Sequence, residues 1–499
     1  MTRWHAEELD ESGGTPMPDR LSALDLSFLY LEEPTTPMHV GSVSVFDTPE
    51  DGFGYDTLLS LVRERLAYVP RYRQRIRRVP GNLANPVWVD DEDFDLTYHV
   101  RRSAVPRPGT LDRLHELVAR LMSRPLDRER PLWEMYLVEG LEHGRFALVS
   151  KTHQAVIDGV SAVDIGQVVL DPQPQAPEAP ADNWVPSPEP TSLELLAGAV
   201  ASAVSRPTDL LETARHTVAE LPLTGGRLVR GVGSAAGSLV TALSTAAWPA
   251  PGSPLNVPIS SQRRFTTVDT SLDDYRAVRA RLGGDVNDVV LATIAGALRS
   301  WLFTRGVRVA PTTSVRALVP MSVLTGEGQS RVAEYIVDLP VGEGSPAMRL
   351  HQVSYAMKAH QETGRAVRAR ALAGMAGFAP PTLHAMGARV ASSLSRRIFN
   401  LVVTNVPGPQ SPLYVAGTQM TGTYPVVPLA KGQALAIGLT SYNGVVCFGL
   451  NADRDAMSDL DVLAQCIPDA LAELIDLVDT DGLVEPPPSQ PDRRRGKAH

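Results

Sequence analysis

A histidine and an aspartate lie close together in the stretch F-A-L-V-S-K-T-H-Q-A-V-I-D-G, where they are His153 and Asp158 and are followed by Gly159. An imidazole with an ordinary pKa near 6.5 can accept a proton at neutral pH, so a histidine held at a fixed point could serve as a general base. A purely structural histidine in a turn, next to an aspartate that caps a helix, would give the same sequence. The window alone therefore leaves a catalytic and a structural interpretation open.

The residues around this group predict the strand, turn and helix that would hold it. Residues 146–152 form a short apolar run with β-branched ends, which is typical of a buried strand. Residues 160–170 carry apolar side chains at helical spacing. Upstream, P-L-W-E-M-Y-L-V predicts another strand, joined to the first through a turn near residues 142–144. We therefore expect a hairpin that delivers His153 to the end of a core strand, facing a cleft.

The composition is that of a globular protein with more than one domain. The chain has 499 residues, of which 43% are hydrophobic and 21% charged, enough for about two or three domains with sizeable cores. Its formal net charge of -9 argues against nucleic acid as a general partner. Cys447 and Cys466 have no spacing typical of a zinc site or a disulfide framework, which fits a reducing compartment. The polar N-terminus lacks the apolar core of a signal peptide, so we expect no secretion.

Proline content and charge divide the chain into lobes and connecting segments. The clearest break is the stretch D-P-Q-P-Q-A-P-E-A-P-A-D-N-W-V-P-S-P-E-P, which cannot hold a helix or a central strand. The expected order is a disordered tail (1–19), an N-terminal lobe (20–170), the proline-rich linker (171–190), a helical connecting region (191–262), a C-terminal lobe (263–483) and a disordered basic tail (484–499). Helices interspersed with strands that are joined partly by hairpins predict an α/β fold with mixed sheets.

One uncharged run has the length of a membrane span. Residues 231–262 contain no Asp, Glu, Lys or Arg. A spanning helix needs about twenty strongly apolar residues, whereas this run is rich in Gly, Ser, Thr and Ala and is interrupted by Pro249, Pro251 and Pro254. We therefore expect no span here, and we prefer a helix that packs on the domain surface or lies at a membrane interface.

The second half of the chain predicts a further sheet with covering helices. Asn287 looks like the N-cap of an apolar helix over residues 288–303, with Asp288 favourably placed in its first turn. Apolar runs flank the tripeptide Y-N-G, whose Asn443-Gly444 pair suits a two-residue turn. These runs predict a hairpin near the end of the chain.

Short motifs in a fixed order resemble those of the wax ester synthase/diacylglycerol acyltransferase family. The window around His153 resembles the family signature H-H-x-x-x-D-G. L-S-A-L-D-L-S-F-L-Y-L-E and P-M-H-V-G resemble the family's opening, and R-P-L-D-R-E-R-P-L-W-E resembles its P-L-W motif. V-N-D-V-V-L-A, V-P-M-S-V, T-N-V-P-G-P and S-Y-N-G follow in the family's order. The resemblance covers roughly residues 20–480.

The resemblance implies the fold and activity of acyltransferases that are similar to chloramphenicol acetyltransferase and to peptide-synthetase condensation domains. Two lobes, each a mixed sheet with helices, would surround a tunnel that acyl-coenzyme A (acyl-CoA) enters from one side and an alcohol from the other. The implied reaction makes triacylglycerol from diacylglycerol, or wax ester from a long-chain alcohol, with a histidine as base on the acceptor hydroxyl. It implies no metal and no cofactor, since acyl-CoA is a co-substrate.

One position departs from the family signature. The second histidine of the signature, four residues before the aspartate, is Gln154 here, and only the first, His153, is present. Because a carboxamide cannot accept a proton at neutral pH, we expect His153 to act as an adapted base. If the strand continues through the pair, however, adjacent residues face opposite sides, and His153 would not take the position of Gln154. A catalytically weak or inactive paralogue that binds lipid or acyl-CoA is therefore the alternative hypothesis.

The resemblance also implies roles for other residues. Asp158 would hold the turn through a partner, expected to be an arginine, without contacting the histidine, and Gly159 would permit the close turn after it. Asn287 and Asp288 would lie near the active site. A second family motif is altered, because S-R stands at residues 330–331 where Asn-Gln or Asn-Arg is usual.

Basic residues gather at two places. Residues 63–78, R-E-R-L-A-Y-V-P-R-Y-R-Q-R-I-R-R, hold seven arginines against one glutamate. A solvated face of a helix and strand is one interpretation, and attraction to anionic lipid headgroups or to the phosphates of CoA is the other. The cysteine pattern and the polar N-terminus lead us to expect a cytoplasmic protein, and this segment, together with the three arginines at 493–495, adds an expected attraction to lipid. We expect the protein to associate peripherally with the inner face of the plasma membrane or with a lipid-droplet surface.

Overall fold

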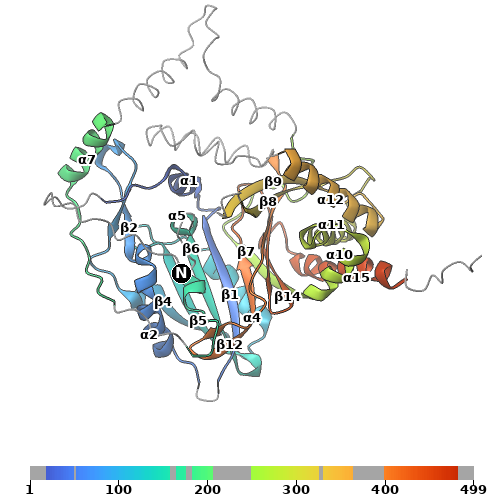
Figure 1. Cartoon of the computed structure of the whole chain (residues 1–499), viewed down its shortest axis with the longest axis horizontal. Helices are drawn as coiled ribbons and strands as arrows, with labels where there is room; N and C mark the ends of the chain where they lie inside the picture. The colour runs from blue at the N-terminus through green and yellow to red at the C-terminus, as the bar shows by residue number, and fades with distance from the viewer. Residues whose placement is uncertain are drawn as a thin grey trace, which may run out of the picture.

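The computed structural model describes residues 18–49, 52–157, 165–175, 182–205, 249–324, 330–363 and 398–480. Asp158 and Gly159 lie outside these residues, as do both chain ends and much of the uncharged run at 231–262. Two six-stranded sheets organise the described part, each with its own buried apolar core and its own packed helices (Figure 1).

The first sheet has the strand order β11-β12-β1-β6-β5-β4. Its strands are β1 (His39–Asp47), β4 (Val100–Ala104), β5 (Trp133–Leu141), β6 (Arg145–His153), β11 (Tyr414–Val415) and β12 (Thr418–Val426). The helices of this lobe are α1 (Ala23–Leu31), α2 (Tyr55–Arg65), α3 (Leu96–His99), α4 (Leu111–Met122), α5 (Gln154–Ile157), α6 (Ile165–Val168) and α7 (Ser192–Ser205). Short 3-10 helices η1 (Leu66–Tyr68), η2 (Pro70–Arg73), η3 (Pro80–Asn82) and η4 (Glu142–Gly144) and the ribbon of β2 (Gln74–Arg77) and β3 (Val87–Asp90) complete it.

The predicted hairpin is confirmed as β5 and β6, which are joined through η4. Every residue of β6 from Phe146 to His153 is buried, because both faces of this sheet are covered. That burial explains why F-A-L-V is continuously apolar instead of alternating, whereas the following S-K-T-H is polar although it is buried too. The strand continues through His153, and α5 begins at Gln154. The two adjacent side chains therefore cannot occupy the same position.

The second sheet has the strand order β7-β14-β13-β10-β8-β9. Its strands are β7 (Arg263–Ser271), β8 (Val315–Leu324), β9 (Ser330–Leu339), β10 (Leu401–Val406), β13 (Leu435–Tyr442) and β14 (Val445–Asp453). Its helices are α10 (Leu272–Leu282), α11 (Val286–Thr304), α12 (Pro346–Thr363) and α15 (Leu460–Thr480). The hairpin predicted around Y-N-G is confirmed as β13 and β14, with both turn residues, Asn443 (φ 45°) and Gly444 (φ 83°), in the left-handed region.

A strand from the C-terminal half completes the N-terminal sheet. Because β12 pairs antiparallel with β1, Thr418–Val426 belongs to the first sheet, and the sequence division that placed it in the C-terminal lobe is wrong for this segment. Where the strand crosses the other sheet, Gly438 and Gly449 face each other across β13 and β14. A Cβ at Gly449 would lie 2.0 Å from the carbonyl oxygen of Pro425. The close approach of the crossing strand therefore requires glycine here.

The start of α11 differs from the prediction. Its N-cap is Asp285, whose side chain accepts a hydrogen bond from the backbone N–H of Asp288, while the Asp288 carboxylate accepts one from the N–H of Asp285. Asn287 is therefore not the cap, because this reciprocal capping box already satisfies the helix end. Helix α11 is long and apolar enough to cross a membrane by composition, but 72% of its apolar window is buried inside the protein. It is a core helix of the second lobe.

The arginine run at 63–78 binds carboxylates of this chain. The ion pairs join Arg65 to Asp171, Arg71 to Asp19, Arg73 to Asp182, and both Arg75 and Arg77 to Glu189. These five arginines thus form ion pairs within the chain, although Arg71 and Arg77 keep 34% and 42% of their side chains exposed. Attraction of the run to lipid or CoA stays a prediction. Three of the four partner carboxylates come from the proline-rich stretch at 171–190. The described parts of that stretch are thus attached to the first lobe.

Candidate active site

The H-Q-A-V motif begins where the backbone is held from both sides. The N–H of His153 donates to the carbonyl oxygen of Leu132 at 3.0 Å, and the N–H of Gln154 donates to that of Met38 at 2.9 Å. Leu132 belongs to the P-L-W segment and Met38 to the P-M-H-V-G segment. Two segments that are distant in sequence thus fix the end of β6. The P-L-W, P-M-H-V-G and H-Q-A-V motifs therefore meet at one point of the fold.

The ring of His153 is buried, with 1% of its side chain exposed. Its Nδ1 accepts a hydrogen bond from the backbone N–H of Ala155 at 3.1 Å, so the neutral ring carries its proton on Nε2. That atom lies 3.9 Å from Oε2 of Glu32. Burial lowers the pKa of His153 to about 4, although Glu32 opposes the shift. The ring is therefore neutral at pH 7, and the nitrogen that has a lone pair is already bonded to the backbone.

Glu32, at the end of α1, is held by other groups than this histidine. Its Oε1 accepts a hydrogen bond from the N–H of Met38 at 3.2 Å, and its Oε2 accepts one from Nε of Arg128 at 3.0 Å. Arg128 also donates to the carbonyl oxygen of Leu29 at 3.0 Å. The L-S-A-L-D-L-S-F-L-Y-L-E motif thus places a carboxylate, already paired with an arginine, opposite the imidazole.

Gln154 has a different environment. It is half-buried, and within the described ranges its carboxamide forms no hydrogen bond. The polar atoms of the Gln154 side chain therefore form no hydrogen bond with described residues, whereas the ring of His153 is buried and hydrogen-bonded. That His153 acts as the base stays a prediction, which requires its Nδ1 to leave the bond from Ala155 or its Nε2 to lose a proton beside Glu32.

Two further basic side chains attach the motif strands to the C-terminal end of α4. His39 lies opposite His153 in the sheet, and its Nε2 donates to the carbonyl oxygen of Met122 at 2.9 Å. Lys151 Nζ donates to the carbonyl oxygen of Arg124 at 2.6 Å. Burial, with Lys151 nearby, lowers the pKa of His39 well below its usual range. The carbonyl groups at a helix C-terminus are suitable acceptors for such donors.

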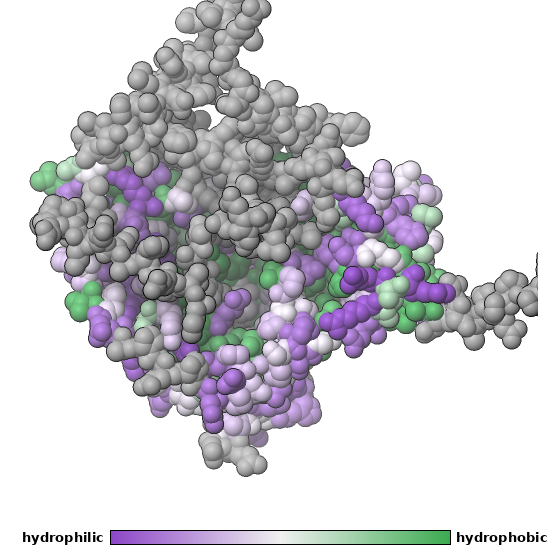
Figure 2. Space-filling model, viewed as in Figure 1, coloured by the Kyte–Doolittle hydropathy of each residue, from purple (hydrophilic) through white to green (hydrophobic). Residues whose placement is uncertain are grey.

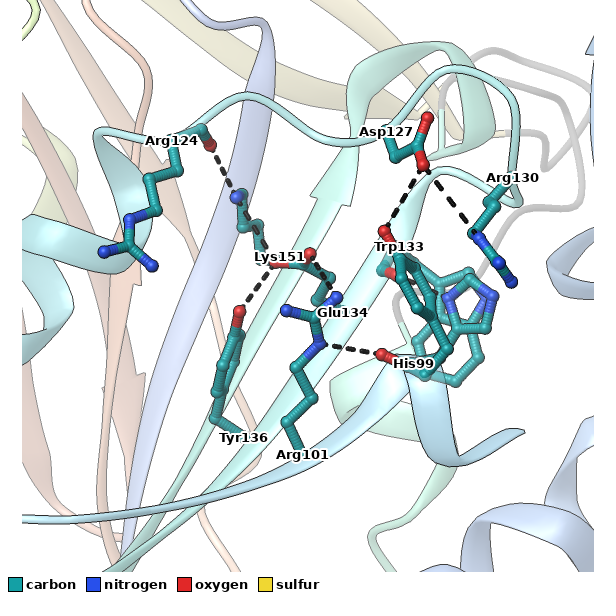
Figure 3. A network of polar contacts seen from close by, with 10 residues as sticks. His99, Arg101, Arg124, Asp127, Arg130, Trp133, Glu134, Tyr136 and Lys151 are labelled. Atoms are coloured by element: carbon teal, nitrogen blue, oxygen red, sulfur yellow. Dashed lines mark hydrogen bonds and ion pairs between the residues drawn. The ribbon is translucent and has the colours of Figure 1, made fainter. Parts of the chain in front are cut away.

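Figure 3 shows the buried charged network that includes Lys151, which sequence reasoning missed. Oε2 of Glu134 accepts a hydrogen bond from the hydroxyl of Tyr136 at 2.8 Å and lies 3.4 Å from Nζ of Lys151, while Oε1 lies 3.2 Å from Arg101. Burial lowers the pKa of Lys151 against the opposing influence of Glu134. The signal in the sequence was a pair of opposite charges, Glu134 and Lys151, within two strands that are buried over most of their length, since such charges are buried only when paired. The network ties β5 to β6 just before the motif.

The later motifs also meet one another. Nδ2 of Asn405, in T-N-V-P-G-P, donates to Oδ1 of Asn287 at 3.1 Å. The neighbouring Asp288 is buried, which raises its pKa. The N–H of Gly408 donates to the hydroxyl of Ser441 at 3.3 Å, so the same segment docks on S-Y-N-G. Asn287 and Asp288 thus belong to one cluster of motifs in the second lobe, while Asp158 and Gly159 remain outside the described residues.

The described residues indicate whether a metal ion or a cavity belongs to the site. Among the described residues no group of three His, Cys, Asp or Glu side chains could hold a metal ion. A depression lined by Pro254, Arg305 and Asp453, among others, lies in the second lobe and contains none of the motif residues. The motif residues can orient substrate groups through hydrogen bonds, which is one requirement of acyl transfer.

Known proteins are similar to this chain over most of its length. Residues 21–290 match the wax ester synthase/diacylglycerol acyltransferase catalytic domain, and residues 330–475 match the C-terminal domain of the same family. A probable diacylglycerol O-acyltransferase, tgs3, from Mycobacterium tuberculosis is 50% identical over 54% of this chain and 98% of its own. Another from that organism, tgs2, is 33% identical over 91% of this chain and 98% of its own.

Solved structures agree with this assignment. A wax ester synthase/diacylglycerol acyltransferase from Marinobacter aquaeolei VT8 covers 92% of this chain and 100% of its own at 30% identity, with a TM-score of 0.64. The first condensation domain of the calcium-dependent antibiotic synthetase, 14% identical, covers 93% of this chain and 97% of its own with a TM-score of 0.59, which shows a shared fold. The predicted two-lobed, chloramphenicol-acetyltransferase-like fold is thereby confirmed. On the two family models and on relatives that match almost end to end, the chain belongs to the wax ester synthase/diacylglycerol acyltransferase family.

Proposed function

We propose that this protein transfers an acyl group from acyl-CoA to the hydroxyl of a diacylglycerol, with a long-chain alcohol as a second acceptor. The observation that carries the proposal is the convergence of motifs on the end of β6, where P-L-W and P-M-H-V-G backbone atoms hold His153 and Gln154. The names of the relatives and of the Marinobacter structure support the acceptor classes.

The proposed reaction exchanges a thioester for an ester. The acceptor oxygen forms a bond to the thioester carbon, the carbon–sulfur bond breaks, and the hydroxyl proton ends on the CoA thiol. No oxidation state changes, so we propose that the reaction needs no cofactor besides the co-substrate. Its demands are a place for the hydroxyl proton, stabilisation of the charge on the carbonyl oxygen, and alignment of the two substrates.

The identity of the base decides how fast this reaction runs. The buried His153, with Nδ1 bonded to Ala155, is arranged as a support for the motif turn. Gln154 stands where the family has its second histidine and can donate and accept hydrogen bonds but cannot take a proton. We therefore propose a slow acyltransferase, in which Gln154 orients the acceptor hydroxyl and no imidazole removes its proton. This combines the predicted activity with the alternative of a weakened enzyme.

The proposal is tested by analysing products from purified protein. Given palmitoyl-CoA with diacylglycerol, or with hexadecanol, the protein is expected to form ester in step with CoA release. Release of CoA without ester would indicate a hydrolase, and the absence of both would leave a lipid-binding or acyl-CoA-binding paralogue.

We also propose that the protein works in the cytoplasm on a lipid surface, either the inner face of the plasma membrane or a lipid droplet. Its acceptors partition into lipid, since each buried methylene contributes about 0.8 kcal/mol. Leu83 and Leu193 are 67% and 76% exposed, and α7, which carries Leu193, packs beside η3, next to Leu83. Arg78 is exposed two residues before η3. Figure 2 shows apolar residues among polar ones at the left edge, where Figure 1 places α7.

Replacing Leu83 and Leu193 together by aspartate is expected to lower binding to anionic phospholipid vesicles on the order of tenfold, because two inserting side chains are lost. Sedimentation with vesicles of phosphatidylglycerol and phosphatidylcholine measures this. Val462→Asp is the matched control, since Val462 is 43% exposed on α15 of the other lobe. Equal binding by the double variant and the wild type would remove this surface from the proposal.

A further inference from the structure

The Glu32 carboxylate joins helix α1 to two other motif segments. Glu32 is the residue at which α1 ends, and its side chain is 7% exposed. Its Oε1 accepts a hydrogen bond from the N–H of Met38 at 3.2 Å, and its Oε2 accepts one from Nε of Arg128 at 3.0 Å. Met38 belongs to P-M-H-V-G and Arg128 to R-P-L-D-R-E-R-P-L-W-E. One buried carboxylate therefore holds three segments that are far apart in sequence.

Two hydrogen bonds in series connect Glu32 to Gln154. Met38 donates its N–H to Glu32, and its carbonyl oxygen accepts the N–H of Gln154 at 2.9 Å. Met38 precedes the first residue of β1, His39, so its N–H is bonded to this carboxylate and not to a neighbouring strand. Because each peptide group is nearly rigid, a displacement of Met38 displaces the backbone of Gln154 as well.

Arg128 holds the carboxylate in place. Its Nε and Nη2 both donate to Oε2 of Glu32, and Nη2 also donates to the carbonyl oxygen of Leu29 at 3.0 Å. Hydrogen bonds between ionised groups are roughly twice as strong as neutral ones. The side chain of Arg128 is 39% exposed. Loss of the carboxylate would therefore leave a cation that water can still solvate, and the fold should survive it.

We propose that Glu32 is a positioning residue for acyl transfer, which acts on Gln154 through Met38. This inference rests on the proposed function, in which the Gln154 carboxamide orients the acceptor hydroxyl. Glu32 touches neither that hydroxyl nor the thioester in this account, and its contribution is the placement of residue 154. Acyl transfer is sensitive to such placement, since a shift of about 1 Å can cost on the order of 10²-fold in rate.

Glu32→Ala removes the acceptor of the Met38 N–H. We expect kcat for ester formation to fall about tenfold or more, with KM for palmitoyl-CoA unchanged, because alignment of the acceptor is lost while binding of acyl-CoA is retained. Hydrogen exchange at the amide of Met38 should become faster. Asp459→Ala is the matched control, because Asp459 pairs with Arg305 and accepts Nε1 of Trp301 at 3.0 Å in the second lobe. It should lower thermal stability similarly and leave kcat unchanged.

A second readout combines these variants with Gln154→His, which places an imidazole at the position that Met38 holds. If Glu32 positions residue 154, the rate gain from Gln154→His should be about tenfold smaller in Glu32→Ala than in Asp459→Ala. A carboxylate that serves only stability would give the same gain in both backgrounds. Such equal gains, with equal kcat in the two single variants, would overturn the inference.

The outcomes separate this inference from the proposed function. If wild-type protein forms ester and Glu32→Ala has the same kcat, Glu32 is not a positioning residue. If wild-type protein forms no ester, the proposed function fails and the positioning role fails with it. Faster exchange at Met38 in Glu32→Ala would then show that the carboxylate holds the segment without serving acyl transfer. Unchanged exchange at Met38 would overturn the contact itself.

Discussion

Gln154→His is expected to raise the rate of acyl transfer by roughly 10²- to 10⁴-fold, the usual contribution of a positioned general base. The backbone of residue 154 is already fixed by its bond to Met38, and within the described residues its side chain has no bond to break. The remaining motifs of the family are in place. An imidazole at this position would therefore supply the one group that the proposed slow enzyme lacks.

The measurement is ester formation from palmitoyl-CoA and diacylglycerol across pH 5 to 9. Gln154→Leu is the control, because it removes the carboxamide without adding a base. The gain in Gln154→His should disappear as the pH falls below the pKa of the new imidazole, since a protonated ring cannot accept a proton. Equal rates in wild type and Gln154→His at every pH would show that position 154 is not the missing base.

Acidification is expected to destabilise the protein steeply between about pH 6.5 and pH 4. His99, His115 and His153 are buried, and burial lowers the pKa of each to about 4. Burial also lowers the pKa of His39 well below its usual range. Above pH 6.5 neither state binds a proton at these rings, and their contribution to stability is complete. As the pH falls, these histidines bind protons in the unfolded chain but stay neutral in the folded chain, so the free energy of unfolding decreases.

Each such histidine lowers the free energy of unfolding by roughly 1.4 kcal/mol for each pH unit of acidification, so four acting together give a slope of about 5 kcal/mol per pH unit near pH 5. Urea unfolding at several pH values measures the slope. His115→Gln keeps a donor for Thr267, which lies 3.0 Å from Nε2, and should remove one histidine's share. His143→Gln, at an exposed turn, should leave the slope unchanged. A flat profile from pH 7 to pH 5 would contradict buried, neutral histidines.

Local pattern was sufficient to predict the elements that deliver the site. The hairpin of β5 and β6 follows from two apolar runs around a turn, and that of β13 and β14 from Asn443-Gly444. Such features depend on neighbouring residues only, which is why the sequence contains them. The end of β6 at His153 was not predicted, so alternation along a strand does not apply to the pair His153 and Gln154, which belong to β6 and α5.

The sequence did not predict which residues form ion pairs or which strands pair with each other. The arginines that resemble a lipid-binding run pair with carboxylates such as Asp171 and Glu189, about a hundred residues away. Strand β12 shows the pattern of any strand, yet it pairs with β1, which lies almost four hundred residues earlier. A charge run indicates that a segment needs counter-charges or solvent, and a strand pattern indicates that it needs a neighbouring strand. Neither pattern identifies the partner residues.

The helix cap illustrates a third limit. Asp285, Asn287 and Asp288 are all residue types that cap helices, so composition alone left the boundary open. Gly283 and Gly284, both at positive φ, separate α10 from Asp285. The capping box then makes Asp285 the N-cap of α11. The side chain of Asn287 is therefore not used as a cap and accepts a hydrogen bond from Asn405. This contact between two motifs is visible only in the tertiary structure.

The most direct test of the central claim is the rate of ester formation by wild type and His153→Asn, measured with palmitoyl-CoA and diacylglycerol. Asparagine can accept the N–H of Ala155 as Nδ1 does, but it has no basic nitrogen. If His153 supports the motif turn in a slow acyltransferase, both proteins form ester at the same low rate and with similar thermal stability. Ester formation by wild type that vanishes in a stably folded His153→Asn would make His153 the base and contradict this account.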